Sequence, residues 1–282
     1  MSYPVRARTV AHDATRRVRW LALAASALWG SAGVSRVAEA QLAVDQTEVF
    51  LGPEAMGKHA VSFNVTNTGG DVVQATIYLQ DWSRAADGQQ AFVPPSTLPH
   101  SCARFLEIFP LTLRLTPGAT QAVRVALTSA DTLTEACWSI VFVESSNPAP
   151  PRAGRQIRYV ARIGVKVYVV PPGLTKEGDV QDVAVERHRP DSTGDTTGRD
   201  FVVTFRNTGG LPLWPHGTIE IRRPDNSVAA TVEVVEFAVL PGDSRRLRVR
   251  VPALPPGSFV ALALIDYGGA DVAGGQARLD GR

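Results

Sequence analysis

Short runs of alternating apolar and polar residues, each ended by a turn-forming cluster, are the feature that most constrains how this chain can fold. Residues 61–66 alternate in this way and stop at residues 67–70, Asn-Thr-Gly-Gly. A period of two places the apolar side chains on one face of a β-strand, and Asn and Gly favour the turn that follows. No stretch keeps a 3.6-residue period, and 24 Gly and 20 Pro punctuate the short runs. We therefore expect an all-β fold with little helix.

The second half of the chain repeats the pattern of the first. Residues 201–210 echo residues 61–70 and end in the same Asn-Thr-Gly-Gly. Residues 240–251 echo residues 115–127, each with a Pro-Gly turn before an alternating strand. Two echoes in the same order indicate two related domains with different loops.

Between the two halves, Pro171-Pro172-Gly173 interrupts the strand pattern, as a domain boundary does. Short strands with frequent turns are typical of immunoglobulin-like sandwiches, and a barrel is the alternative. We expect two tandem immunoglobulin-like β-sandwich domains, covering residues 41–172 and 173–282.

Residues 1–40 have a different composition from the rest. Arg16, Arg17 and Arg19 precede an apolar run, and Ala38-Glu39-Ala40 follows it. This order is that of a secretory signal peptide. The apolar run of about 13 residues is short for a bilayer of ~30 Å, so we expect a signal peptide over residues 1–40, with a membrane anchor as the alternative. No later run approaches 18 apolar residues, so we expect no transmembrane segment in the mature chain.

Export determines how the two cysteines, Cys102 and Cys137, are interpreted. In an oxidising compartment an even pair favours a disulfide, and two buried free thiols are the alternative. The five histidines are dispersed, with no pair at ligand spacing. We expect neither a metal site nor a cofactor.

The chain lacks the local motifs of the common enzyme classes. There is no Gly-x-Ser-x-Gly elbow, phosphate-binding loop, His-Glu-x-x-His or Gly-x-Gly-x-x-Gly. The net charge is +2, and Lys and Arg are scattered along the expected strands, which disfavours nucleic acid as a partner. We expect a protein that binds polypeptide and is not an enzyme.

The most informative segment is residues 157–168. Its apolar side chains occupy every second position and so share one face of a strand: Ile157, Tyr159, Ala161, Ile163, Val165 and Val167. One interpretation places that face in the chain's own core. If the strand lies at a sheet edge, its free backbone groups can instead pair with a partner strand.

Five stretches stand in order along the chain: residues 44–50, 115–125, 135–144, 157–172 and 265–269, the last reading Ile-Asp-Tyr-Gly-Gly. Together they resemble the periplasmic pilus-assembly chaperones, the PapD-like family. The resemblance implies two immunoglobulin-like domains in the periplasm. It also implies that residues 157–165 are lent as a strand to incomplete pilus-type subunits without ATP, and that an outer-membrane usher is a further partner.

The resemblance also implies roles for single residues. Lys166 matches a lysine that anchors the subunit's C-terminal carboxylate, and an ordinary strand-end lysine is the alternative. Glu135 and Asp266 match acidic positions used between the domains, and a solvated Glu and a turn-stabilising Asp are the alternatives.

One position departs from the family. A second cation is expected in the first strand, where this chain has Glu48. A carboxylate repels another carboxylate. The alignment is therefore shifted, another cation such as Arg158 or Arg162 substitutes, or the chain binds its partner differently.

The sequence thus leads to two functional hypotheses. The first is a chaperone for pilus or surface-fibre subunits. The second is a periplasmic or cell-surface structural or adhesive module, since residues 207–210, 217–221 and 254–257 resemble generic extracellular sandwich repeats.

Overall fold

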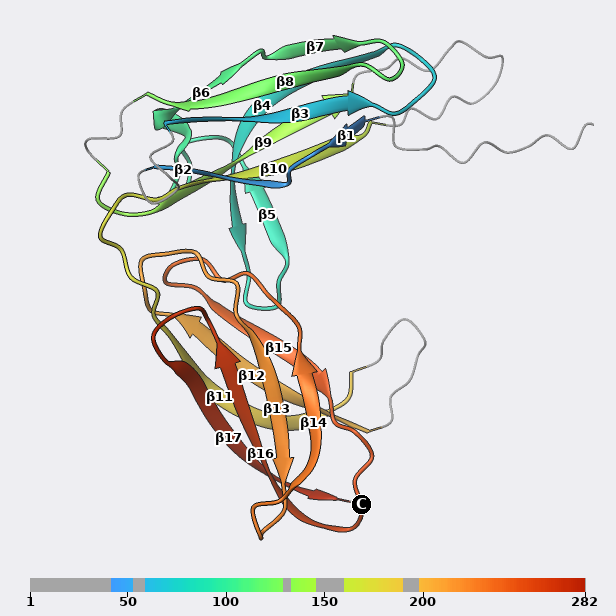
Figure 1. The fold of residues 1–282 in the computed structure, drawn as a ribbon, viewed down its shortest axis with the longest axis vertical. Coiled ribbons are helices and arrows are strands. Elements are labelled where there is room, and N and C mark those ends of the chain that lie inside the picture. The colour runs from blue at the N-terminus through green and yellow to red at the C-terminus, as the bar shows by residue number, and fades with distance from the viewer. Residues whose placement is uncertain (1–41, 53–58, 129–132, 146–159, 190–197, 282) are drawn as a thin grey trace, which may run out of the picture. The chain divides into compact units, whose positions relative to one another are not determined.

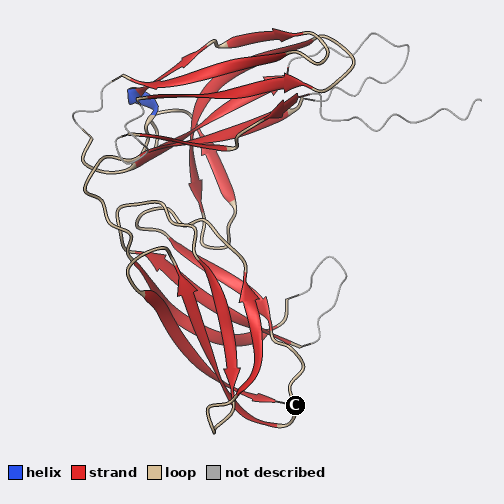
Figure 2. Cartoon of the chain, in the orientation of Figure 1, coloured by secondary structure: helices blue, strands red, loops and turns tan. Residues whose placement is uncertain are grey.

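A computed structural model describes residues 42–52, 59–128, 133–145, 160–189 and 198–281 (Figure 1). The described chain is almost entirely strands, with one short 3-10 helix, η2 (Ala103–Phe105), as Figure 2 shows. The described ranges hold no helical segment with the length and hydrophobicity of a membrane span. The expected signal peptide lies outside the described residues.

The first half of the chain forms a sandwich of two sheets. One sheet has the order β1 (Leu42–Val44), β3 (Ala60–Asn67), β8 (Thr120–Leu127), β6 (Leu106–Phe109). The other has the order β2 (Glu48–Leu51), β10 (Arg162–Val169), β9 (Cys137–Ser145), β4 (Val73–Arg84), β5 (Gln90–Val93), and β7 (Thr112–Leu115) also pairs with β4.

The core of this sandwich draws on both sheets. Phe63 and Val123 come from one sheet and Val141 and Val167 from the other, and all four are fully buried. The disulfide Cys102–Cys137 joins the loop before η2 to the start of β9, with 5.2 Å between the Cα atoms. This is the pairing that the export signal favours.

The second half forms a separate sandwich. Its sheets have the orders β11 (Gly178–Arg187), β12 (Arg199–Asn207), β15 (Ser244–Arg250), and β14 (Val228–Val234), β13 (His216–Arg222), β16 (Gly257–Asp266), β17 (Val272–Gly281). Phe201, Phe205, Ile219 and Ile265 fill the core between them. The expected all-β fold of two tandem sandwiches is confirmed, and β11, the first strand of the second sandwich, begins shortly after the Pro-Pro-Gly.

A buried asparagine fixes the turn after β3. The amide nitrogen of Asn67 donates to the carbonyls of Asp71, at 2.7 Å, and Leu115, at 3.0 Å. Its side-chain oxygen accepts the Gly69 N–H at 2.9 Å. Asn67 is fully buried, and its side chain satisfies the Leu115 carbonyl, which is buried with it.

Asn207 has the same arrangement after β12. Its amide nitrogen donates to Leu211 O at 2.7 Å and Val239 O at 3.1 Å, and its oxygen accepts the Gly209 N–H at 3.0 Å. The repeated Asn-Thr-Gly-Gly is therefore the same hydrogen-bonded turn in both sandwiches.

We expect Asn67→Ala to destabilise the protein by about 2–4 kcal/mol, because it leaves the buried Leu115 carbonyl without this donor and removes the side-chain bonds that fix the turn. Urea unfolding measures the change. Asn64→Ala, an exposed amide on the same strand, is the matched control and is expected to cost less than about 1 kcal/mol. Equal costs at the two positions would contradict the role given to Asn67.

We expect Cys102→Ala/Cys137→Ala to lower the free energy of unfolding by about 3–4 kcal/mol, because the disulfide closes a loop of sequence separation 35. Urea unfolding of the oxidised and reduced wild type is the control, since reduction breaks the link but keeps both sulfurs. A loss in the double variant without a loss on reduction would mean that packing, not the link, stabilises the fold.

Candidate functional site: the edge of β10

β10 has a sheet partner along the whole of one edge and along half of the other. On one side β9 pairs with it antiparallel from Arg162 to Val169. On the other side β2 pairs with it in parallel, and the register begins only at Lys166, opposite Glu48. The Lys166 N–H donates to Thr47 O at 2.9 Å. Among the described strands, residues 162–165 have no ladder on that second edge.

The backbone groups on this open edge follow from the alternation of a strand. The N–H groups of Lys166 and Val170 donate toward β2, to Thr47 O and Leu51 O. Residues two apart direct their backbone groups to the same side. The N–H and C=O groups of Arg162 and Gly164 therefore point to the open edge. The nearby β1 pairs with β3 in the other sheet.

The inner face of β10 belongs to the chain's own core. Val165 is fully buried and Ile163 packs against the same core cluster. Val165, which the sequence placed in the partner-facing set, therefore has its side chain inside the first sandwich in this structure. Ala161 lies half-buried just before β10. Ile157 and Tyr159 lie outside the described residues.

The outer face of β10 carries charge over aromatic rings. The Arg162 guanidinium lies 4.4 Å from the centre of the Phe142 ring. At Gly164, an added Cβ would come within 2.6 Å of the Ile140 side chain, so the neighbouring strand occupies the space of a side chain there. The Lys166 ammonium lies 5.3 Å from the Trp82 ring centre.

Lys166 forms an ion pair with Glu48. Their atoms Nζ and Oε1 are 2.7 Å apart, and the side chains are 18% and 25% exposed. Glu48, the glutamate found where the resemblance predicts a cation, therefore contacts Lys166 directly, because the two residues lie opposite each other in the β2–β10 register. Lys166, predicted to anchor a carboxylate, thus has Glu48 as its partner in this structure.

An aromatic cluster beside this pair escaped the sequence analysis. Tyr168 is fully buried, stacks on Phe50 with ring centres 5.0 Å apart, and meets Trp82 and Trp214 edge-on. Strand alternation places Tyr168 on the same outer face as Lys166, so the sequence could have predicted this one member of the cluster. Trp214 follows β12, so no local pattern links it to the cluster.

Burial raises the pKa of the Tyr168 phenol, and the negative charge of Glu48 raises it further. The hydroxyl makes no hydrogen bond of acceptable geometry within the described residues, although Glu48 is close enough to affect its pKa. A buried hydroxyl without a partner costs stability.

The two acidic positions expected between the domains are not joined to each other by any hydrogen bond or ion pair in the described part of the chain. Glu135 is exposed just before β9. Asp266, at the end of β16, accepts the Gly268 N–H at 2.8 Å and so stabilises its own turn. The described residues also bring together no group of His, Cys, Asp and Glu side chains that could hold a metal ion.

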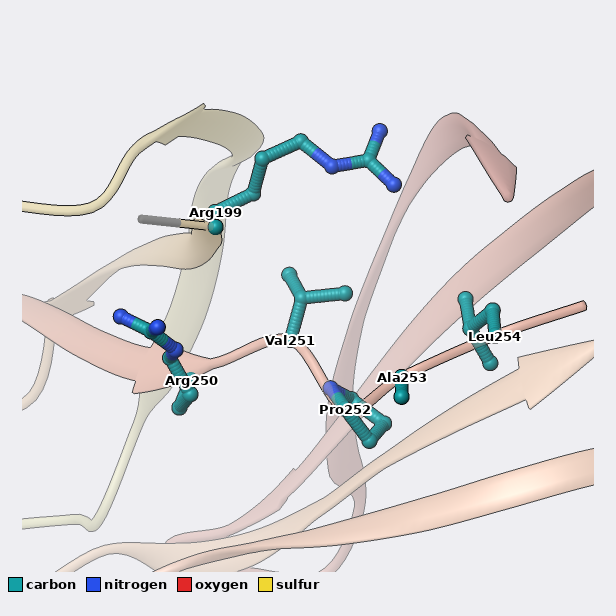
Figure 3. Close-up of a pocket in the computed structure, with 7 residues that line it drawn as sticks. Arg199, Arg250, Val251, Pro252, Ala253 and Leu254 are labelled. Carbon is teal, nitrogen blue, oxygen red and sulfur yellow. The ribbon is translucent and has the colours of Figure 1, made fainter. Parts of the chain in front are cut away.

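An open depression of about 570 Å³ lies in the second sandwich, remote in sequence from β10 (Figure 3). Its polar lining is Arg199 and Arg250, and Figure 3 shows their side chains extending in different directions. Arg199 donates to the carbonyl of Asp280 at 2.5 Å. The two guanidinium groups therefore do not form one anion clamp.

The raised pKa of Tyr168 predicts how stability responds to alkaline pH. Because the pKa of the Tyr168 phenol is higher in the folded state than the unfolded value of about 10, ionisation of the phenol favours the unfolded state. The contribution of Tyr168 to the free energy of unfolding is therefore present below about pH 10 and is lost as the pH rises above it. We expect Tyr168→Phe to flatten this decline in urea unfolding at about pH 9 to 11. At neutral pH the variant should lie within about 1 kcal/mol of wild type. Tyr267→Phe is the control, and identical pH profiles for wild type and Tyr168→Phe would contradict the prediction.

No protein-family model matches the chain, and no curated protein matches it. Among solved structures it is similar to the class 5 fimbriae chaperone CfaA, at 12% identity and a TM-score of 0.48, covering 84% of this chain and 98% of that chain. It is similar to the CupB2 chaperone of Pseudomonas aeruginosa at 16% identity and a TM-score of 0.44, covering 85% and 100%. A structure of the Salmonella enterica SafA pilin in complex with the SafB chaperone matches at 12% identity and a TM-score of 0.42, covering 84% and 96%. These similar structures are therefore of chaperones, one of them a fimbriae chaperone and one in complex with a pilin.

Proposed function

We propose that this chain is a periplasmic chaperone that holds incomplete pilus or surface-fibre subunits by lending them an edge strand. The observation that carries the proposal is the open edge of β10 over residues 162–165. On its other edge, β10 is paired with β9 along its whole length. Free backbone groups at a sheet edge readily pair with an extended segment of another chain. The sequence motifs that resemble the pilus chaperones assign the lending role to this same strand.

The backbone makes the first contact in this mechanism. The N–H and C=O groups of Arg162 and Gly164 form hydrogen bonds with the partner strand. The apolar side chains of Ile157, Tyr159 and Ala161 are proposed to fill the partner's incomplete core. Each backbone bond contributes about 0.5–1.5 kcal/mol net, and burial of apolar side chains adds to it. Binding of this kind uses no nucleotide and no catalytic group, so the proposal is for an ATP-independent protein that is not an enzyme.

The proposal also includes a compartment and a second partner. The sequence of residues 1–40 supports export, and a disulfide in the first sandwich is stable in the oxidising periplasm. A chaperone that captures subunits there must also release them for assembly, and we propose an outer-membrane usher as the partner at that step.

A proline at position 162 tests the open edge directly. Proline removes the backbone N–H that points to the open side and places its ring there, while the β9 side is unaffected. We expect Arg162→Pro to weaken capture of a subunit by about tenfold or more. The probe is a secreted pilus-type subunit from the same organism, with affinity measured by titration calorimetry.

Arg162→Ala is the matched control, because it removes the side chain over Phe142 but keeps the N–H. We expect it to change the affinity by less than about threefold. Thermal unfolding of both variants checks that the fold is kept. If Arg162→Pro captures subunits as well as Arg162→Ala does, strand lending at this edge is refuted. Absence of capture by the wild type would favour the structural or adhesive module.

A further inference from the structure

A buried carboxylate on β4, that of Asp81, ties the segment before Cys102 to the first sandwich. Asp81 is fully buried, and strand lending makes no use of it. Its Oδ2 accepts the backbone N–H groups of Thr97, at 2.7 Å, and Leu98, at 2.9 Å. Its Oδ1 accepts the hydroxyl of Ser101 at 2.5 Å. Hydrogen bonds to a carboxylate are stronger than those between neutral groups, so Asp81 gives this segment a defined place.

The same carboxylate faces the start of β9, which carries the other cysteine. The Ser139 hydroxyl donates to Asp81 Oδ1 at 3.5 Å, and its oxygen accepts the Cys102 N–H at 3.2 Å. Ser139 is fully buried and follows Cys137 by two residues. Asp81 therefore lies between the two segments that hold the cysteines, whose Cα atoms are 5.2 Å apart.

The backbone contact between these two segments is short. The Trp138 N–H donates to His100 O at 2.9 Å, and the Cys102 N–H reaches Trp138 O at 3.4 Å. Ser101 and Trp138 form an isolated parallel bridge and lie outside any ladder of the described strands. A single bridge fixes little of the segment by itself, so its position depends largely on side chains, and Asp81 binds it at three points.

We infer that Asp81 is the positioning residue for the Cys102–Cys137 disulfide. Its three hydrogen bonds to the segment before Cys102 use no sulfur atom, so they are available in the reduced protein and hold the two thiols close together. Groups held in a reactive geometry react as if they were at a far higher concentration. The inference concerns how the first sandwich is closed, and it is independent of the proposed strand lending.

The oxidation that this geometry favours is an exchange with a small disulfide such as oxidised glutathione. One cysteine thiolate attacks that disulfide, forms a mixed disulfide and releases one glutathione thiolate. The other cysteine thiolate then attacks the protein sulfur of the mixed disulfide, which forms the Cys102–Cys137 bond and releases the second glutathione. Both cysteines are oxidised, oxidised glutathione is reduced to two thiols, and the two cysteine protons pass to those thiols. Asp81 acts on the second attack, which is intramolecular.

The test measures the effective concentration of the two thiols, from the ratio of oxidised to reduced protein in glutathione buffers. We expect Asp81→Ala to lower it by about tenfold or more, because the segment before Cys102 loses its acceptor. Asp81→Asn should stay within about threefold of wild type, since its amide oxygen still accepts two N–H groups and its NH₂ can donate to the Ser101 oxygen. No loss in Asp81→Ala, or an equal loss in Asp81→Asn, would overturn the inference.

Asp45→Ala is the matched control, because Asp45 also accepts a backbone N–H, that of Asn64 at 2.7 Å, in the same sandwich. We expect it to change the effective concentration by less than about threefold, and a loss equal to that of Asp81→Ala would also overturn the inference. Near-UV circular dichroism checks that each reduced variant is folded. If reduced Asp81→Ala unfolds, Ser101→Ala takes its place, with an expected loss of about threefold or more. An unchanged effective concentration in Ser101→Ala would then overturn the inference.

Discussion

The structure depends most on how the backbone of β10 satisfies its hydrogen bonds. β9 pairs with it throughout, whereas β2 pairs with it only from Lys166 onward. β2 is limited to this half because the chain crosses between the two sheets just before it, after β1 has paired with β3. One short crossing thus closes the sandwich and also leaves residues 162–165 with one unpaired edge. The feature that we propose for binding is a direct result of the way the fold is closed.

This arrangement requires a rigid frame, and the buried asparagines provide part of it. Asn67 holds the turn after β3 to the end of β7 through Leu115 O. Asn207 does the same in the second sandwich through Val239 O. The hydrogen bonds are equivalent although the loops around them differ. A recurrent tetrapeptide in the sequence therefore reports a recurrent physical need, which is to satisfy buried backbone groups at the point where a strand turns back.

The sequence was sufficient for the fold and only partly sufficient for the site. Alternation and turn clusters predicted the strands and the two sandwiches. The signal-like sequence of residues 1–40, which indicates an oxidising compartment, led to the predicted Cys102–Cys137 disulfide. Alternation also grouped Ile163 and Val165 on one face, but it cannot tell which body covers that face, and here the chain's own core does so. The contact between Lys166 and Glu48 depends on a parallel register between segments more than 100 residues apart, and no local pattern encodes such a register.

Glu48 illustrates how a departure from a resemblance becomes informative once its neighbours are known. Taken alone, a glutamate at a position where a cation is expected indicates only that this chain differs from the family at that position. Opposite Lys166 in the ladder, it becomes the lysine's own counter-ion; the lysine also lies over the Trp82 ring, and the charge of the glutamate raises the pKa of the buried Tyr168. The low exposure of both side chains makes the pair costly to break, since a separated charge would lose its partner without regaining full hydration. A group that binds the Lys166 ammonium would therefore have to compete with Glu48 for it.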